Sequence, residues 1–180
     1  MNGSPVTVDG TATYTPPSGT VLPTGAGQEL SVAFTPTNTT DYNNASGDVT
    51  INVGFGTCTG PNGPGLQILQ PINADGTSVF KLGRTVPVKF TVCDANGNPI
   101  SDPMTVFGNN TGSITLLSAV RGTINGVNET GTNDIPDVAF RYSDGIWIFN
   151  MATSNMQAPA TYTFQINLAS GSIQFQFGTK

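Results

Sequence analysis

Residues 160–177 read ATYTFQINLASGSIQFQF, and this stretch decides the fold class. On either side of the short turn at residues 169–171, apolar and polar side chains alternate strictly. The apolar members are Tyr162, Phe164, Ile166, Leu168, Ile173, Phe175 and Phe177. Because neighbouring side chains of a β-strand point to opposite faces, this alternation predicts two strands that share one buried face. The stretch therefore predicts a β-hairpin.

Three further stretches upstream show strand patterns. In residues 86–93 the side chains expected to point inward are Val86, Val88, Phe90 and Val92, and those expected to point outward are Lys89 and Thr91. A second hairpin is expected where residues 137–142 and 146–151 flank the turn at residues 143–145, and an isolated apolar strand is expected at residues 113–120. No window shows the 3.6-residue apolar period of a helix. The chain is therefore expected to be all-β.

Composition excludes several classes of function. The chain has 180 residues and a formal net charge of -5, which gives no electrostatic reason to expect nucleic acid or anionic lipid as a partner. It contains no histidine, the residue that most often serves as general base and as zinc ligand. We therefore expect no enzyme activity, no cofactor and no bound metal.

The first residues and the hydropathy bear on location. Residues 1–20 contain no basic segment followed by an apolar one, and no stretch approaches the ~18 apolar residues of a membrane-spanning helix. We expect neither a signal peptide nor a membrane span, as in a mature or excised part of a longer chain. Only 9% of the residues are charged, and Thr and Asn are abundant, which favours an extracellular, cell-surface protein.

Cys58 and Cys93 are the only cysteines. They do not form a C-x-x-C motif, and no histidine is present that could complete a zinc site with them. We predict a structural disulfide between them, which would suit an exported protein. The alternative is a pair of free thiols in a reducing compartment.

The first third of the chain is expected to be a separate unit. Three strands are predicted there, at residues 11–15, 28–36 and 47–53. Residues 5–8 are a candidate for a fourth. A Gly- and Pro-rich linker, residues 54–65, then breaks the pattern. We therefore predict one domain in residues 1–56 and a second in residues 57–180.

Residues 11–53 read TATYTPPSGTVLPTGAGQELSVAFTPTNTTDYNNASGDVTINV. Over about residues 9–53 the chain resembles the second half of the Ig-like repeats of large bacterial surface proteins. In those repeats a Tyr-Thr-Pro strand and a Leu-x-Val-x-Phe-x-Pro strand precede a final Val-x-Ile-x-Val strand. The first strands of the repeat do not precede this run. The resemblance therefore implies an incomplete N-terminal Ig-like unit.

The rest of the chain resembles a second family. The runs LQPINADGTSVFKLGRTVPVKFTVCDANGNPI and FRYSDGIWIFNMATSNMQAPATYTFQINL are similar to PxKD-type Ig-like modules, over about residues 66–178. Residues 78–90 carry the most specific part of this likeness. The resemblance implies an Ig-like β-sandwich and brings no catalytic residues.

Two groups of oxygen-bearing side chains suggest chemistry. Asp94, Asn96 and Asn98 stand at alternate positions, the spacing of calcium ligands in an EF-hand loop, but no closing glutamate follows them. A hairpin turn is the simpler interpretation. Asp134 and Asp137 could form the carboxylate pair of a glycosidase, but they flank Pro136 in a loop without an apolar pocket, so we expect solvated carboxylates.

Two other groups suggest binding or cross-linking. Trp147, Tyr142 and Tyr162 could form a platform for a sugar ring, although such aromatics are more often core residues. A cross-link from Lys81 or Lys89 to an asparagine would need a buried acid, and the only glutamates are Glu29 and Glu129. We expect both lysines to be ordinary side chains.

These observations favour a non-enzymatic spacer in an exported bacterial surface, adhesive or filament protein. The alternative is a carbohydrate-binding accessory module with a surface glycan as its partner. Half a sandwich leaves its apolar face and its strand edges uncovered. The N-terminal unit could therefore dock on the second domain, stay disordered or pair with another copy. We expect strand addition between chains, with other copies of the protein as partners.

Overall fold

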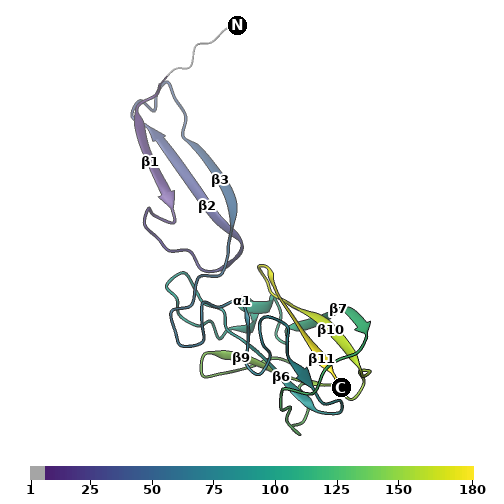
Figure 1. Ribbon diagram of the computed structural model, residues 1–180. Helices are drawn as coiled ribbons and strands as arrows, with labels where there is room; N and C mark the ends of the chain where they lie inside the picture. The colour runs from purple at the N-terminus through teal and green to yellow at the C-terminus, as the bar shows by residue number, and fades with distance from the viewer. Residues whose placement is uncertain (1–6) are drawn as a thin grey trace. The chain divides into compact units, whose positions relative to one another are not determined.

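A computed structural model describes residues 7–180, which divide into two compact units. Unit 1 ends at Val53, and unit 2 comprises Gly54–Lys180. Both are built from sheets in which all but one strand pair is antiparallel, so the chain is all-β, as predicted (Figure 1). No helix within residues 7–180 is long and apolar enough to cross a membrane.

Unit 1 is one three-stranded sheet, in the order β1-β2-β3. Its strands are β1 (Gly10–Thr15), β2 (Gly25–Pro36) and β3 (Ala45–Val53), and both pairs are antiparallel. The three predicted strands are therefore present, each starting one to three residues earlier than expected. Residues 7 and 8 are not in a strand, and residues 5 and 6 of the proposed fourth strand lie outside the described part of the chain.

Unit 2 is a β-sandwich of two four-stranded sheets. The first sheet has the order β5 (Val79–Phe80), β11 (Ser172–Thr179), β10 (Ala160–Asn167) and β7 (Ser113–Arg121). The second has the order β4 (Ile68–Leu69), β6 (Thr85–Phe90), β9 (Ile146–Ala152) and β8 (Arg141–Ser143). The predicted hairpin of residues 160–177 is the β10–β11 pair, in unbroken register from Ala160 to Asn167.

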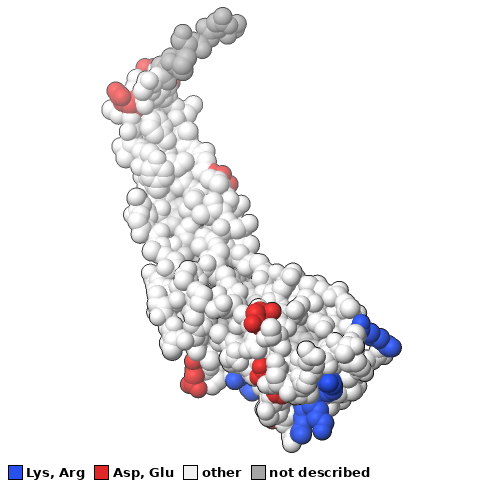
Figure 2. All heavy atoms as spheres, in the orientation of Figure 1, with Lys and Arg blue, Asp and Glu red and all other residues white. Residues whose placement is uncertain are grey.

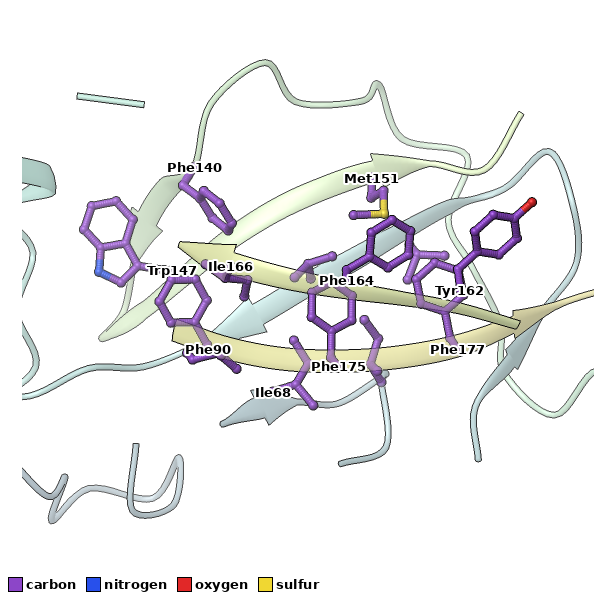
Figure 3. Close-up of a cluster of buried hydrophobic side chains, with 14 of the residues drawn as sticks. Ile68, Phe90, Phe140, Trp147, Met151, Tyr162, Phe164, Ile166, Phe175 and Phe177 are labelled. Atoms are coloured by element: carbon purple, nitrogen blue, oxygen red, sulfur yellow. The ribbon is translucent and has the colours of Figure 1, made fainter. Parts of the chain in front are cut away.

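The core of the sandwich contains ten side chains that the alternation predicted, and Leu168 is partly buried and packs against it. The residues concerned are Val86, Val88, Phe90, Val92, Tyr162, Phe164, Ile166, Ile173, Phe175 and Phe177, all buried. Figure 3 shows the rings of Phe164, Phe175 and Phe177 gathered between the strands. Phe164 stacks on Phe175 and on Phe177, with ring centroids 5.4 Å apart in each pair. Aromatic burial of this kind is a main source of stability in a sandwich.

The sandwich also contains one short helix that the alternation did not predict, α1 (Pro103–Phe107). Asp102 caps its N-terminus by accepting a hydrogen bond from the backbone N–H of Thr105 at 2.9 Å. Gly108 ends it in the left-handed conformation. The helix buries Val106 and Phe107, and the ring of Phe107 packs against Phe90 of β6.

Two predictions about strands were wrong. Thr91 was expected to point outward, but it is buried, and its hydroxyl donates a 2.9 Å hydrogen bond to the carbonyl of Gly145. The strand expected at residues 137–142 is shortened to Arg141–Ser143. Pro136 has no backbone N–H that could join a strand pair. At the next position the carboxylate of Asp137, and not a backbone carbonyl, accepts the N–H of Asn150, so the regular backbone pairing does not extend there.

Candidate functional site

Cys58 and Cys93 form the predicted disulfide. The linker around Cys58 is also tied down by backbone hydrogen bonds, from Gly56 N to the carbonyl of Cys93 at 2.8 Å and from Cys58 N to the carbonyl of Pro64 at 2.9 Å. Both cysteines are buried. The linker is therefore fastened to the segment that follows β6.

Asp94, Asn96 and Asn98 form a tight turn. One carboxylate oxygen of Asp94 accepts the backbone N–H groups of Asn96 and Asn98, both at 2.9 Å, and the other accepts the side-chain amide of Asn98 at 3.3 Å. The N–H of Asn98 is the main cause that lowers the pKa of Asp94 below its ordinary value. Gly97 takes the left-handed conformation that such a turn needs. This is the geometry of the hairpin-turn interpretation.

Asp134 and Asp137 do come together, but around a side chain that the sequence analysis did not single out. The side-chain amide of Asn150 donates to Asp134 Oδ2 at 2.8 Å, and its backbone N–H donates to Asp137 Oδ2 at 2.7 Å. Asp137 also pairs with Arg141. Asn150 is only 3% exposed. Asp134 is exposed and Asp137 is partly exposed, and both are also anchored to β9, so their arrangement holds a loop.

The proposed aromatic platform does not exist. Trp147 is 2% exposed, its ring packs against Phe107, and its Nε1 donates to the carbonyl of Ile100 at 2.9 Å. Tyr162 is buried as well, and its hydroxyl donates to the carbonyl of Gln157. Tyr142 is half-buried and packs against Trp147. Trp147 and Tyr162 are core residues, so the three rings do not form an exposed platform for a sugar.

The lysine cross-link gains no support from the geometry. Lys89 lies on β6 opposite Ile148, not opposite an asparagine. Glu129 accepts a hydrogen bond from the side-chain amide of Asn73 at 3.1 Å, and Glu29 lies on β2 in unit 1. The described contacts therefore bring neither glutamate to a lysine.

The feature that stands out in unit 1 is the sorting of side chains between the two faces of its sheet. Directly opposed residues of antiparallel strands share a face, so the register assigns every residue. One face, here called the apolar face, carries Gly10, Ala12, Tyr14, Leu30, Val32, Phe34, Pro36, Ala45, Gly47, Val49 and Ile51, and it also includes the polar side chain of Gln28. The opposite face carries Thr11, Thr13, Thr15, Glu29, Ser31, Ala33, Thr35, Ser46, Asp48 and Thr50. A sheet with this division is built to bury one side.

Unit 1 covers that apolar face only in part: Pro36 is buried and Leu30, Val32 and Phe34 are partly buried, but other residues of the face are exposed. Tyr14 is 61% exposed and Val49 is 56% exposed, and no apolar residue among the described residues of unit 1 belongs to the buried core. At one end, the loop after β1 forms a hollow of about 360 Å³ with Tyr14, Leu22 and Leu30 among its lining residues. An apolar face that its own unit covers only in part marks an interaction surface.

A second exposed apolar region lies on β7, which is an edge strand of the sandwich. Leu116, Leu117 and Val120 are exposed there. The β7–β10 register shifts between Thr163 and Phe164, so Leu117 is an additional, bulged residue. A bulge disturbs the regular ladder and protects an edge against further pairing. The unit 1 sheet also has a register shift, between Gly25 and Gln28 at one end of the β2–β3 pair, but its apolar face is more extensive and is the stronger candidate.

Charge is also divided between the units. All six Lys and Arg residues lie in unit 2, whereas unit 1 contains four acidic residues, Asp9, Glu29, Asp41 and Asp48, and hence a formal charge of −4. In the view of Figure 2 the visible basic atoms accordingly lie over unit 2.

Comparison with known proteins adds no relative, since no family model and no curated protein matches the chain.

Proposed function

We propose that the chain is a non-enzymatic structural module, a spacer within an exported bacterial surface, adhesive or filament protein, and that its two units are Ig-like. The observation that carries this proposal is the apolar face of unit 1, which its own unit covers only in part. A domain whose apolar sheet face has to be covered by another domain or another chain is suited to assembly.

The side chains of unit 2 support a structural role. Its acidic residues take part in turns, a helix cap and the loop anchored on Asn150. Its aromatic residues fill the core, and one disulfide fastens the linker. A disulfide suits an oxidising, extracellular setting. The chemistry of this unit is therefore that of a stable scaffold.

Assembly between copies is the second part of the proposal. β1 and β3 are the edge strands of the unit 1 sheet, and each pairs only with β2 among the described strands. Neither pair has a register shift along the stretch from Gln28 to Pro36. Regular edges of this kind accept a further strand, so strand addition between chains is the expected mode of assembly.

Binding to a glycan array and to insoluble polysaccharides tests the spacer against the alternative. We expect no sugar binding. The exposed aromatic ring beside the hollow of unit 1 belongs to Tyr14, so Tyr14→Ala is the informative variant. Sugar binding that Tyr14→Ala abolishes, with the circular dichroism spectrum unchanged, would establish a carbohydrate-binding module and refute the spacer.

A further inference from the structure

We infer that Asn44, immediately before β3, is an acceptor for an N-linked sugar, and that it is the acceptor which the folded chain offers within residues 7–180. The sequence Asn-x-Ser/Thr, with x other than proline, is the acceptor signal of N-glycosylation. Within residues 7–180 it begins at Asn38, Asn44, Asn109 and Asn128. A further copy, at Asn2, lies outside the described residues. Because so short a signal also arises by chance in a chain rich in Asn and Thr, the structure has to separate the four.

The side-chain amide nitrogen of the asparagine is the atom that the transfer modifies. It attacks C1 of a sugar that is activated as a diphosphate. A C–N bond forms, the C1–O bond to the diphosphate breaks, the diphosphate leaves with the electron pair of that bond, and one amide proton passes to a base of the transferase. An amide nitrogen that already donates a hydrogen bond inside the chain must first give up that bond. An acceptor on a folded chain therefore has to be exposed and without a partner.

Two of the four asparagines are exposed but engaged in their own turns. The side-chain nitrogen of Asn38 donates to Asp41 Oδ2 at 2.8 Å, and the side-chain oxygen of Asn38 accepts the backbone N–H of Asp41 at 3.3 Å. The side-chain nitrogen of Asn109 donates to the carbonyl of Phe107 at 3.2 Å, and its side-chain oxygen accepts the N–H of Gly112 at 2.7 Å. Asparagine commonly stabilises turns in this way. Both amides are therefore occupied.

Asn128 is exposed and engaged with a distant segment. Its side-chain oxygen accepts the N–H of Val79 in β5 at 2.7 Å, and its side-chain nitrogen donates to the carbonyl of Thr77 at 3.1 Å. The two bonds hold the segment around Asn128 to the start of β5. A sugar on this nitrogen would have to displace the bond to Thr77.

Asn44 differs from the other three. Its side chain is exposed, and in the described part of the chain no group forms a hydrogen bond with it. The signal also needs the hydroxyl of Ser46, which is exposed and likewise has no partner among residues 7–180. Every residue in the stretch 41–50 is exposed. Both groups that define the signal are therefore free to contact a transferase.

The backbone of the signal suits a peptide-binding groove. Asn44 is the last residue of a loop, and Ala45 is the first residue of β3, so residues 44–46 pass from a loop into an extended strand. β3 is an edge strand that pairs with β2 on one side only, among the described strands. An extended segment with one open edge is a form that peptide-binding grooves commonly take up.

A sugar on Asn44 would also act on the assembly proposed above. It stands at the beginning of β3, one of the two edges that could accept a further strand, and a bulky hydrophilic group there hinders pairing along that edge. Strand addition is then directed to β1. This consequence rests on the proposed assembly, whereas the acceptor role of Asn44 does not.

Transfer of sugar in vitro to the folded full chain, carrying Asn2→Gln, tests the inference. One arm uses UDP-glucose with a soluble N-glycosyltransferase, and the other uses a lipid-diphosphate-linked oligosaccharide with a purified oligosaccharyltransferase, so the productive arm identifies the source of the activated sugar. Peptide mapping by mass spectrometry locates the product. We expect transfer to Asn44 and at least about tenfold less at each of the other three, because freeing each of those amides breaks two or more hydrogen bonds.

Three variants separate the signal from the fold. Ser46→Ala removes the hydroxyl of the signal and should abolish transfer to Asn44, whereas Ser46→Thr retains a hydroxyl and should preserve it. Asp41→Ala releases the side-chain nitrogen of Asn38 and should raise transfer to Asn38, with Asn44 still modified. Normal circular dichroism of each variant is the required control for folding.

Short synthetic peptides, each centred on one of the four asparagines, show what the local sequence accepts without the fold. Transfer to the Asn44 peptide but not to Asn44 of the folded chain would overturn the inference, as would a peptide that accepts no sugar in either arm. Equal transfer to all four asparagines of the folded chain would refute selection by hydrogen bonding. A chain that accepts sugar at Asn44 and stays monomeric at every concentration would support the acceptor role and refute only the proposed assembly.

Discussion

The buried side-chain amide of Asn150 donates a 2.8 Å hydrogen bond to the carboxylate of Asp134, and Asp137 accepts the backbone N–H of the same asparagine. This one residue of β9 adds two hydrogen bonds to those that Thr85 makes with Thr132 and Asp134, and together they hold the irregular segment before β8 against the sandwich. Asp134 and Asp137, which could suggest a catalytic pair in the sequence, therefore have a structural role.

Replacing Asn150 with alanine should destabilise unit 2 by about 1–3 kcal/mol, because the change removes a hydrogen bond from a buried amide to a charged carboxylate. Urea unfolding followed by the fluorescence of Trp147, the only tryptophan, measures the change. Asn167→Ala is the matched control, since that amide also donates hydrogen bonds, but to the exposed hydroxyls of Ser113 and Thr115. An equal cost for the two variants would contradict the anchoring role of Asn150.

Replacing Phe164 with alanine should cost about 3–5 kcal/mol, since its ring is buried between Phe175 and Phe177 and the change leaves a cavity. Gln165→Ala, at the next position of β10 and on the other face, should change the free energy of unfolding by less than about 0.5 kcal/mol. Chemical denaturation of both variants compares the two faces directly. A cost below about 1 kcal/mol for Phe164→Ala would mean that the faces are assigned incorrectly.

Removing the disulfide with Cys58→Ala and Cys93→Ala together should lower the stability of unit 2 by about 4 kcal/mol, the loop-closure entropy expected for its length. Denaturant unfolding of the double variant measures this loss. Mass spectrometry of the unreduced wild-type chain after alkylation provides an independent check. Two alkylated cysteines in that spectrum would be incompatible with the bond.

Stability should fall in acid, in part through Asp94. Its folded pKa is lowered, chiefly by the N–H of Asn98, so the stabilisation is complete above the ordinary pKa of about 3.9 and is lost as the pH falls through the lowered folded pKa. Asp94→Asn removes this titration and should flatten the dependence of unfolding free energy on pH below about pH 4. Denaturant titrations at several pH values measure the slope. If Asp94→Asn leaves the pH dependence of the unfolding free energy unchanged, the hydrogen bonds of the turn do not stabilise the Asp94 carboxylate in solution.

Alternation alone was sufficient to predict most of the strands. Ten core residues follow from it, and all but Val92 lie on strands; β10 and β11 show the alternation most clearly. Where both sides of a strand are covered, alternation carries less information. Thr91 was expected on the outer face, but it is buried because its hydroxyl donates a hydrogen bond to the carbonyl of Gly145. Trp147 packs against Phe107 of α1, a helix that no apolar periodicity predicts.

The candidate interaction surface was partly predictable. The sequence indicates that the strands of unit 1 have apolar faces and too few partners for a sandwich. Which residues share a face depends on the register of all three strands, and register is a property of pairing between distant segments. The opposition of Val32 to Gly47, on which the shape of the apolar face depends, could therefore be read only from the structure.

The Cys58–Cys93 disulfide has a consequence for a chain placed under tension. The two cysteines are separated by 35 positions, and the bond makes the segment between them a closed covalent loop. A pulling force along the chain passes through the sulfur atoms and bypasses β4, β5 and β6, which lie inside the loop. Even when unit 2 unfolds mechanically, about 120 Å of chain cannot extend until the bond is reduced. The disulfide therefore sets a maximum length for the stretched module.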